Sequence, residues 1–150
     1  MTRSERLGVV QNATAHTERE HAERVAHAER HVVEMEDKLA ALERYRKEYE
    51  VGFASRAGAG LGVTAVRDYQ AFLARLGEAL EQQRLAVEKA RAAHEAAIAL
   101  WREAAKRAHV VDTLAERWQL EESRAESRRD QRDSDELSQQ QRLQDREGKS

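Results

Sequence analysis

Apolar residues in the first half of the chain recur at alternating steps of three and four positions. This spacing is typical of a heptad seam, so it predicts a long helix that packs one stripe of side chains against another helix. The same frame continues towards the N-terminus through mostly polar residues, where looser packing is expected. Thr2 and Glu5 have the spacing of a capping box, which predicts the helix start. The apolar series is Val25, Ala28, Val32, Met35, Leu39 and Leu42, then, after a miss at Arg46, Tyr49 and Phe53.

A second, longer series with the same spacing occupies the second half of the chain. Only Gln83 and His94 interrupt it, and it fails after Trp118. It predicts a second helix with a continuous apolar stripe. The series is Val66, Tyr69, Leu73, Leu76, Leu80, Gln83, Val87, Ala90, His94, Ala97, Trp101, Ala104, Ala108, Val111, Ala115 and Trp118.

Four of the seven glycines lie between the two series, at 52, 58, 60 and 62. Because glycine admits the positive φ angles that a chain reversal needs, this segment is predicted to be a turn. The predicted fold is all-α, a single domain over residues 1–150 in which two long helices form an antiparallel coiled-coil hairpin. Helix 1 is expected at about 3–52, the turn at about 53–62 and helix 2 at about 63–120, with a polar extension, helical or frayed, to 150.

The register of this hairpin is predicted by matching the strong layers of the two seams. Tyr49 is placed opposite Val66 and Met35 opposite Leu80. The same register places His21 opposite His94, so the two polar interruptions coincide. A slip of one heptad stays open, because the seams repeat every seven residues.

Composition narrows the classes of function. Charged residues make up 36% and aromatic residues 5% of the 150 residues, which suits a narrow seam and not a thick globular core. Basic and acidic residues, 26 and 28, are interleaved and leave a formal net charge of -2, which argues against a nucleic-acid partner. The N-terminus lacks the apolar stretch of a signal peptide, and no later segment approaches the about 18 apolar residues of a membrane span, so a cytoplasmic protein is expected.

The candidate chemical groups are few. His27 and His31 have the i,i+4 spacing of two metal ligands on one helical face, but no third ligand is evident, and a solvated face is the preferred interpretation. The pair His21 and His94 is interpreted as a polar layer that fixes register, with a pH-sensitive weak point as the alternative. Residues 58–62 lack the strand and the glycine spacing of a dinucleotide loop. The sequence therefore indicates no enzyme, no metal and no cofactor.

Apolar residues outside the seam form the most informative feature. Tyr45, Phe72 and Ala79 fall at heptad positions that flank the seam, and antiparallel pairing brings these positions along one edge near the turn. Clustered aromatics on an edge suggest a docking surface. The alternative is that the rings simply cover a broad seam.

An ordered set of landmarks resembles the FliJ family, the coiled-coil component of the flagellar type III export apparatus. The landmarks run from about Leu42 to Arg117 and are Tyr45-x-x-x-Tyr49, the glycine-rich bend, Tyr69-Gln70-x-Phe72-Leu73-x-x-Leu76, Ala79, Trp101-Arg102-Glu103 and Leu114-x-Glu116-Arg117. The N-terminal third and the segment after Trp118 are similar to the family only in their general character and not in specific landmarks.

The resemblance implies a function and partners. It implies a central stalk of the hexameric flagellar export ATPase (FliI-like), which links that ring to the cytoplasmic domain of the export gate (FlhA-like) and assists the recycling of export chaperones. It also implies a location at the cytoplasmic face of the inner membrane. The gate-binding residues that it implies are Leu42, Tyr45, Tyr49, Phe72, Leu76 and Ala79. Lys38 and Gln83, at the rim, depart from the family's common pattern. Alternatives are the injectisome counterpart and a self-associating scaffold.

Overall fold

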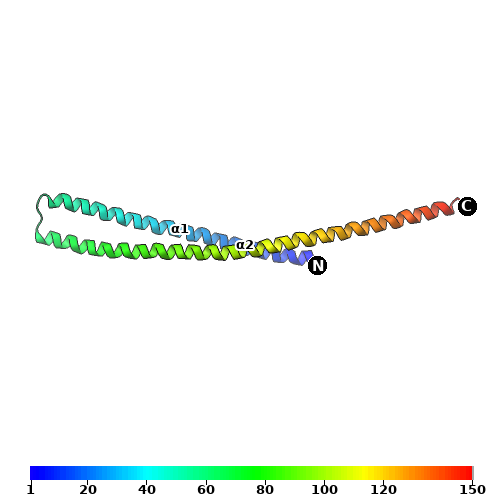
Figure 1. Cartoon of the computed structure of the whole chain (residues 1–150), viewed down its shortest axis with the longest axis horizontal. Helices are drawn as coiled ribbons and strands as arrows, with labels where there is room; N and C mark the ends of the chain where they lie inside the picture. Colours follow the sequence, from blue (N-terminus) through cyan, green and yellow to red (C-terminus); the bar gives the residue numbers. More distant parts are fainter. Residues whose placement is uncertain (150) are drawn as a thin grey trace. The chain divides into compact units, whose positions relative to one another are not determined.

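A computed structural model describes residues 1–149, and these residues form two helices (Figure 1). Helix α1 comprises Arg3–Ala57, 55 residues, and helix α2 comprises Val63–Glu147, 85 residues. The part of the chain that is described contains no strand. The predicted all-α hairpin with a longer second helix is confirmed.

The start of α1 has the predicted capping box. The backbone N–H of Thr2 donates to Glu5 Oε2 at 2.9 Å, and the N–H of Glu5 donates back to Thr2 Oγ1 at 3.1 Å. Two N–H groups that a helix end cannot satisfy are thereby bonded to side chains.

The turn is shorter than the sequence predicted. Helix α1 continues to Ala57, so residues 53–57, which were assigned to the turn, are helical. Phe53 explains the difference, because its ring stacks on Tyr69 of α2 with centroids 3.6 Å apart and so holds another turn of helix in the pairing. The reversal needs only 58–62, where Gly60 has a φ of 90°.

Contacts along the hairpin divide the chain into two compact units. One unit contains residues 18–103, that is, the turn and the helix segments next to it; the other pairs residues 1–17 with the chain from 104 onwards. In the first unit the buried residues are Leu76, Leu80, Val87 and Ala90, and in the second they are Leu7, Ala104 and Ala115.

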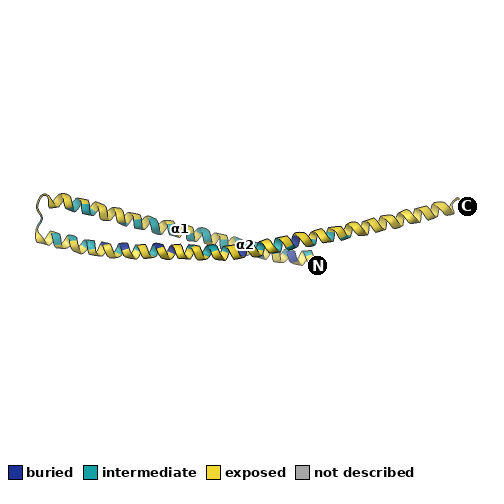
Figure 2. Ribbon diagram, in the orientation of Figure 1, coloured by how far each residue is buried: buried dark blue, intermediate teal, exposed yellow. Residues whose placement is uncertain are grey.

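Burial follows the predicted seams (Figure 2). Every position of the α2 series, from Val66 to Trp118, is buried or half-buried, and so is the α1 series with the exception of Arg46, the position where the pattern misses. Even the polar residues in the early part of the α1 frame, such as Gln11 and Glu18, are half-buried. The heptad pattern therefore located the interface on both helices.

The predicted register is wrong. Tyr49, expected opposite Val66, instead contacts Tyr69 and Phe72, with ring centroids 5.5 and 4.2 Å apart. Met35, expected opposite Leu80, accepts a hydrogen bond from Gln83. Each partner lies three to six residues further along α2, in the direction of the one-heptad slip that the sequence left open.

A contact beside the predicted histidine layer shows the same shift. Glu18, one turn before His21, bonds to Trp101, which lies two turns beyond His94. The shift has a physical cause, because it stacks the large rings near the turn on one another, whereas the expected pairing would place Tyr49 against a valine.

Helix α2 continues beyond its paired segment. After Trp118 only positions 122 and 125 are half-buried, and residues 126–149 are exposed. The extension left open by the sequence is thus helical up to Glu147. Within residues 1–149, neither helix has a stretch that combines the length and apolarity of a membrane span.

Candidate partner-binding surface

All three tyrosines and both phenylalanines of the chain gather in one cluster near the turn. Phe53 stacks on Tyr69 with the rings 7° from parallel, and Tyr49 lies 4.2 Å from Phe72. Tyr45 extends the cluster away from the turn, with its ring 6.0 Å from that of Phe72 in an edge-on geometry. We call these five residues the aromatic cluster.

Helix geometry explains why the cluster forms. On α1 the rings occupy 45, 49 and 53, steps of four that place them on one stripe, and on α2 they occupy 69 and 72, a step of three. Antiparallel pairing brings the two stripes together. Each favourable ring pair stabilises by about 0.5–1.5 kcal/mol beyond its burial, so the cluster holds the turn end of the hairpin closed.

The structure brings the predicted edge residues to this region but exposes them unequally. Tyr45 is 50% exposed. Leu42, Tyr49, Phe72 and Ala79 are half-buried, and Leu76 is buried. The outer part of this edge is therefore formed mainly by Tyr45, flanked by the half-buried members.

Sequence reasoning omitted two members of the cluster. Phe53 and Tyr69 were recognised as seam residues but not as part of the edge, although they make the closest ring stack. The available signal was their aromatic type at facing seam positions next to the turn.

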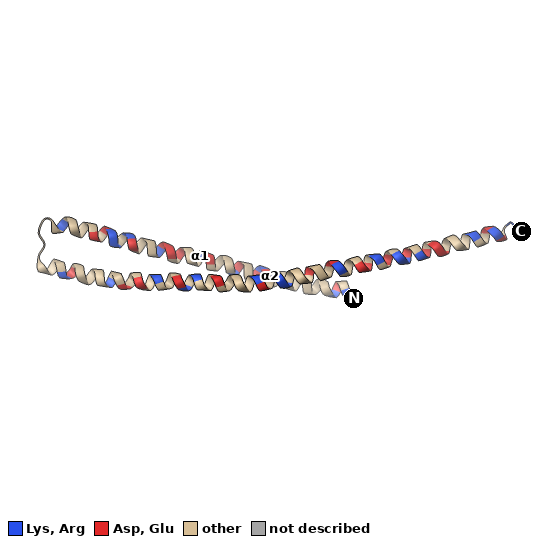
Figure 3. Cartoon of the chain, in the orientation of Figure 1, with Lys and Arg blue, Asp and Glu red and all other residues tan. Residues whose placement is uncertain are grey.

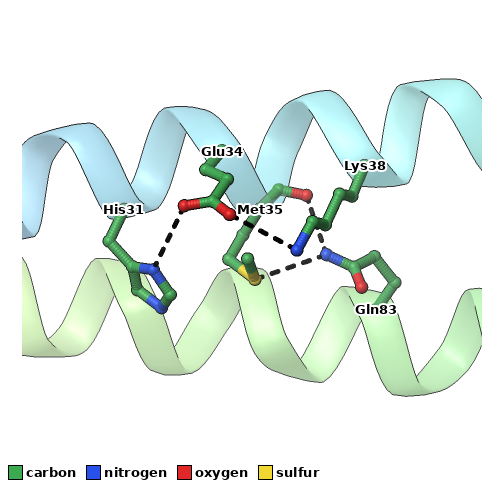
Figure 4. A network of polar contacts seen from close by, with 5 residues as sticks. All are labelled: His31, Glu34, Met35, Lys38 and Gln83. Atoms are coloured by element: carbon green, nitrogen blue, oxygen red, sulfur yellow. Dashed lines mark hydrogen bonds and ion pairs between the residues drawn. The ribbon is translucent and has the colours of Figure 1, made fainter.

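The two predicted rim residues differ in environment (Figure 4). Lys38 is exposed and pairs with Glu34, its Nζ lying 3.4 Å from Oε1. Gln83 is half-buried and points across the helix pair, where its Nε2 donates to the Met35 carbonyl at 2.9 Å and approaches Met35 Sδ at 3.5 Å. Gln83 is therefore bound within the seam, while Lys38 remains at the surface.

Polar side chains bridge the helices further from the turn. In the unit that contains the turn, Trp101 Nε1 donates to Glu18 Oε1 at 2.7 Å. In the other unit, Gln11 Nε2 donates to Asp112 Oδ1 at 2.8 Å.

Arg3 closes the paired segment of that second unit. Its guanidinium lies 4.1 Å from the centre of the Trp118 ring and pairs with Glu121 at 2.9 Å. Here the helices are joined by polar and cation–π contacts as well as by apolar ones.

The histidine pair that was considered for metal binding has an ordinary surface environment. His31 Nδ1 lies 4.0 Å from a Glu34 carboxylate oxygen. Among residues 1–149, no three His, Cys, Asp or Glu side chains are grouped in a way that could hold a metal ion.

The fold and the aromatic cluster define a two-helix coiled-coil protein with a partly exposed aromatic edge beside its turn. The family model described as flagellar FliJ protein matches residues 3–147. A protein of Salmonella typhi named flagellar FliJ protein is 32% identical over 104 residues, which cover 69% of this chain and 71% of the relative. No solved structure gives a significant match. The chain belongs to the FliJ family and is thus a flagellar protein.

Proposed function

We propose that this protein is a non-enzymatic stalk of the flagellar export apparatus, which occupies the export ATPase ring and links it to the export gate. The observation that supports the proposal most is the aromatic cluster. This chain belongs to the FliJ family, its rings gather beside the turn, and the ring of Tyr45 is half exposed there. Partner binding is commonly dominated by such aromatic anchors.

The gate is proposed to bind the edge formed by Leu42, Tyr45, Tyr49, Phe72, Leu76 and Ala79. Tyr45 offers the most accessible ring of the set, and its hydroxyl can bond to a partner while its ring packs. Leu76, being buried, supports the edge from beneath and does not contact the gate itself. Lys38 supplies a cation at the rim, whereas the Gln83 amide is engaged by Met35.

The ATPase ring is proposed to receive the unit that pairs residues 1–17 with the chain from 104 onwards. The buried side chains of this unit are one leucine and two alanines, and its helices are also joined by Gln11–Asp112 and Arg3–Glu121. Small apolar layers and solvated polar bridges hold helices together more weakly than large apolar layers. A stalk that has to adapt to changing ring subunits benefits from such a pairing.

Two further parts of the proposal follow from the same role. The protein is proposed to be held at the cytoplasmic face of the inner membrane through its partners. It is also proposed to assist the recycling of export chaperones, for which the long exposed surfaces of both helices leave room.

The test of the proposed function is the binding of the full chain to the isolated cytoplasmic domain of the gate. We expect Tyr45→Ala, alone and combined with Phe72→Ala, to weaken binding by at least about tenfold, since an aromatic anchor typically contributes more than 1 kcal/mol. Val33→Ala is the matched control, because Val33 is 51% exposed on the same helix as Tyr45. Undiminished binding of a folded double variant refutes the docking edge.

A self-associating scaffold is the second candidate. The exposed part of α2 beyond residue 125 favours it, since such a helix has no partner from α1. Sedimentation across a concentration series separates the two candidates. A monomer at all concentrations that promotes assembly of the flagellar ATPase ring supports the stalk, and a concentration-dependent dimer with no effect on the ring supports the scaffold.

A further inference from the structure

The tip of the hairpin, residues 51–67, contains no acidic residue. The chain as a whole has 28 acidic residues among 150, yet none lies between Glu50 and Asp68. The same segment contains two arginines, Arg56 and Arg67. Figure 3 shows the result, since the helix ends beside the turn are mostly tan and lack red. The tip therefore has a positive charge in a chain that is otherwise well mixed.

The surface of the tip is also apolar. Val51 is 63% exposed and Val63 is 72% exposed, on the two sides of the turn. Between them residues 54–60 are exposed, and most of these are alanine or glycine. The larger Phe53 is directed into the stack with Tyr69. What the tip presents to its surroundings is thus aliphatic side chains and turn backbone, together with the exposed Arg56 and Arg67.

The beginning of α2 adds to the positive character of the tip. Its first turn contains no acidic side chain, and Gly62, just before it, has no side chain that could cap the helix. The start of α1, by contrast, has Thr2 and Glu5 in a capping box. The partial positive charge of the α2 N-terminus is therefore not offset by an acidic side chain in its first turn.

We infer that the hairpin tip binds the surface of an anionic lipid bilayer. In this arrangement Val51 and Val63 enter the boundary between headgroups and acyl chains, and Arg56 and Arg67 meet lipid phosphates. The inference does not depend on the ATPase or gate partners, because it rests on residues outside the gate-binding edge.

The chemistry of the tip suits lipid better than a protein groove. Binding sites for proteins usually contain a large anchor such as Trp or Tyr, and the rings of this chain lie in the aromatic cluster and not at the outer tip. Small aliphatic residues next to arginines match the layered chemistry of a bilayer, apolar below and anionic at the surface. With only a few inserting side chains, binding is weak and reversible, which suits a contact that supplements others.

The experiment is sedimentation of the full chain with vesicles of phosphatidylcholine, with or without phosphatidylglycerol. Each arginine near an anionic surface strengthens binding. The two arginines should therefore make binding to vesicles with phosphatidylglycerol about thirtyfold tighter than binding to vesicles of phosphatidylcholine alone. Arg56→Gln with Arg67→Gln should remove most of this preference.

The apolar part is tested by Val63→Asp and Val51→Asp, each expected to lower vesicle binding by about tenfold. An acidic residue in the first turn of α2 favours the helix, so Val63→Asp cannot reduce binding by unfolding it. The control is Val110→Asp. Val110 is 64% exposed, which is nearly the same exposed fraction as that of Val51, but it does not belong to the tip segment 51–67.

Three results of the vesicle experiment overturn the inference. The first is that the chain does not sediment with anionic vesicles. The second is that Val63→Asp binds these vesicles as well as the parent chain does. The third is that Val110→Asp lowers vesicle binding as much as the tip variants do. If the tip variants instead reduce binding to the gate domain in the absence of lipid, the tip is a protein contact and the lipid inference is wrong. None of these outcomes bears on the Tyr45 test, so the two proposals fail separately.

Discussion

Leu80→Ala tests the seam at its most enclosed point. Leu80 has no exposed surface, and within residues 1–149 it is the one large side chain with less than 2% exposure. The substitution removes three carbon atoms. Their transfer from water is worth about 2 kcal/mol, and the space left behind adds to the loss in closely packed proteins.

The seam of a helix pair is open on both sides, so neighbours and water can partly fill the space. We therefore expect a loss of about 2–4 kcal/mol in the free energy of unfolding, within the usual range for buried leucines. For a chain of this size such a loss lowers the melting temperature by about 5–12 °C. The change is measured by circular dichroism at 222 nm during heating and during urea titration.

Leu85→Ala is the matched control for this prediction. Leu85 lies on the same helix but is 55% exposed. Alanine is at least as good a helix former as leucine, so the free energy of unfolding should change by no more than about 0.5 kcal/mol. If Leu80→Ala and Leu85→Ala destabilise the protein equally, the face assigned to the interface of α2 is wrong.

Three further substitutions test polar contacts, each by urea unfolding unless stated. Gln83→Leu should raise the free energy of unfolding by about 1 kcal/mol, because an apolar side chain replaces an amide within the seam, and Met35 loses only a supplementary bond. Trp101→Phe should lower it by about 1 kcal/mol through loss of the bond to Glu18. Thr2→Ala should weaken the start of α1 by about 1 kcal/mol, seen as faster amide hydrogen exchange in the first turn. If one of these substitutions leaves its assay unchanged, that result contradicts the corresponding contact.

The positions of the two helices could be predicted because a two-helix protein has one buried stripe per helix. Residues such as Leu76, Leu80 and Val87 stand in a strict alternation of three and four, and the same alternation decides which side chains lose water. Even the failure of the pattern was informative, since Arg46 is exposed where the series misses.

The register could not be obtained from the same pattern. Sliding one seam against the other by a heptad places apolar residues opposite apolar residues again, so the burial energy alone hardly distinguishes the two choices. What distinguishes them is shape, namely the stacking of Phe53 on Tyr69 and the reach of the Gln83 amide to the Met35 carbonyl. Contacts of individual side chains are not visible in a heptad pattern.

The edge was predicted from heptad positions alone, without the depth at which each ring packs. Heptad position correctly placed Tyr45 beside the seam, where half its surface is exposed. It did not show that the Tyr49 and Phe72 rings would pack against each other, 4.2 Å apart and tilted by 38°, and so belong to both the seam and the edge. The depth at which each ring lies depends on the register, and the register was the missing quantity.

This double role determines how the edge can be studied. Replacing Tyr49 or Phe72 removes ring contacts that hold the helices together, so a loss of partner binding by such a variant has two possible causes. Tyr45 makes two ring contacts, at 6.0 and 6.4 Å, which are both longer than the 4.2 Å between Tyr49 and Phe72, and half of its surface is exposed. Its substitution should therefore reduce binding more than stability. A comparison of binding and unfolding for Tyr45→Ala and Tyr49→Ala separates recognition from the closing of the hairpin.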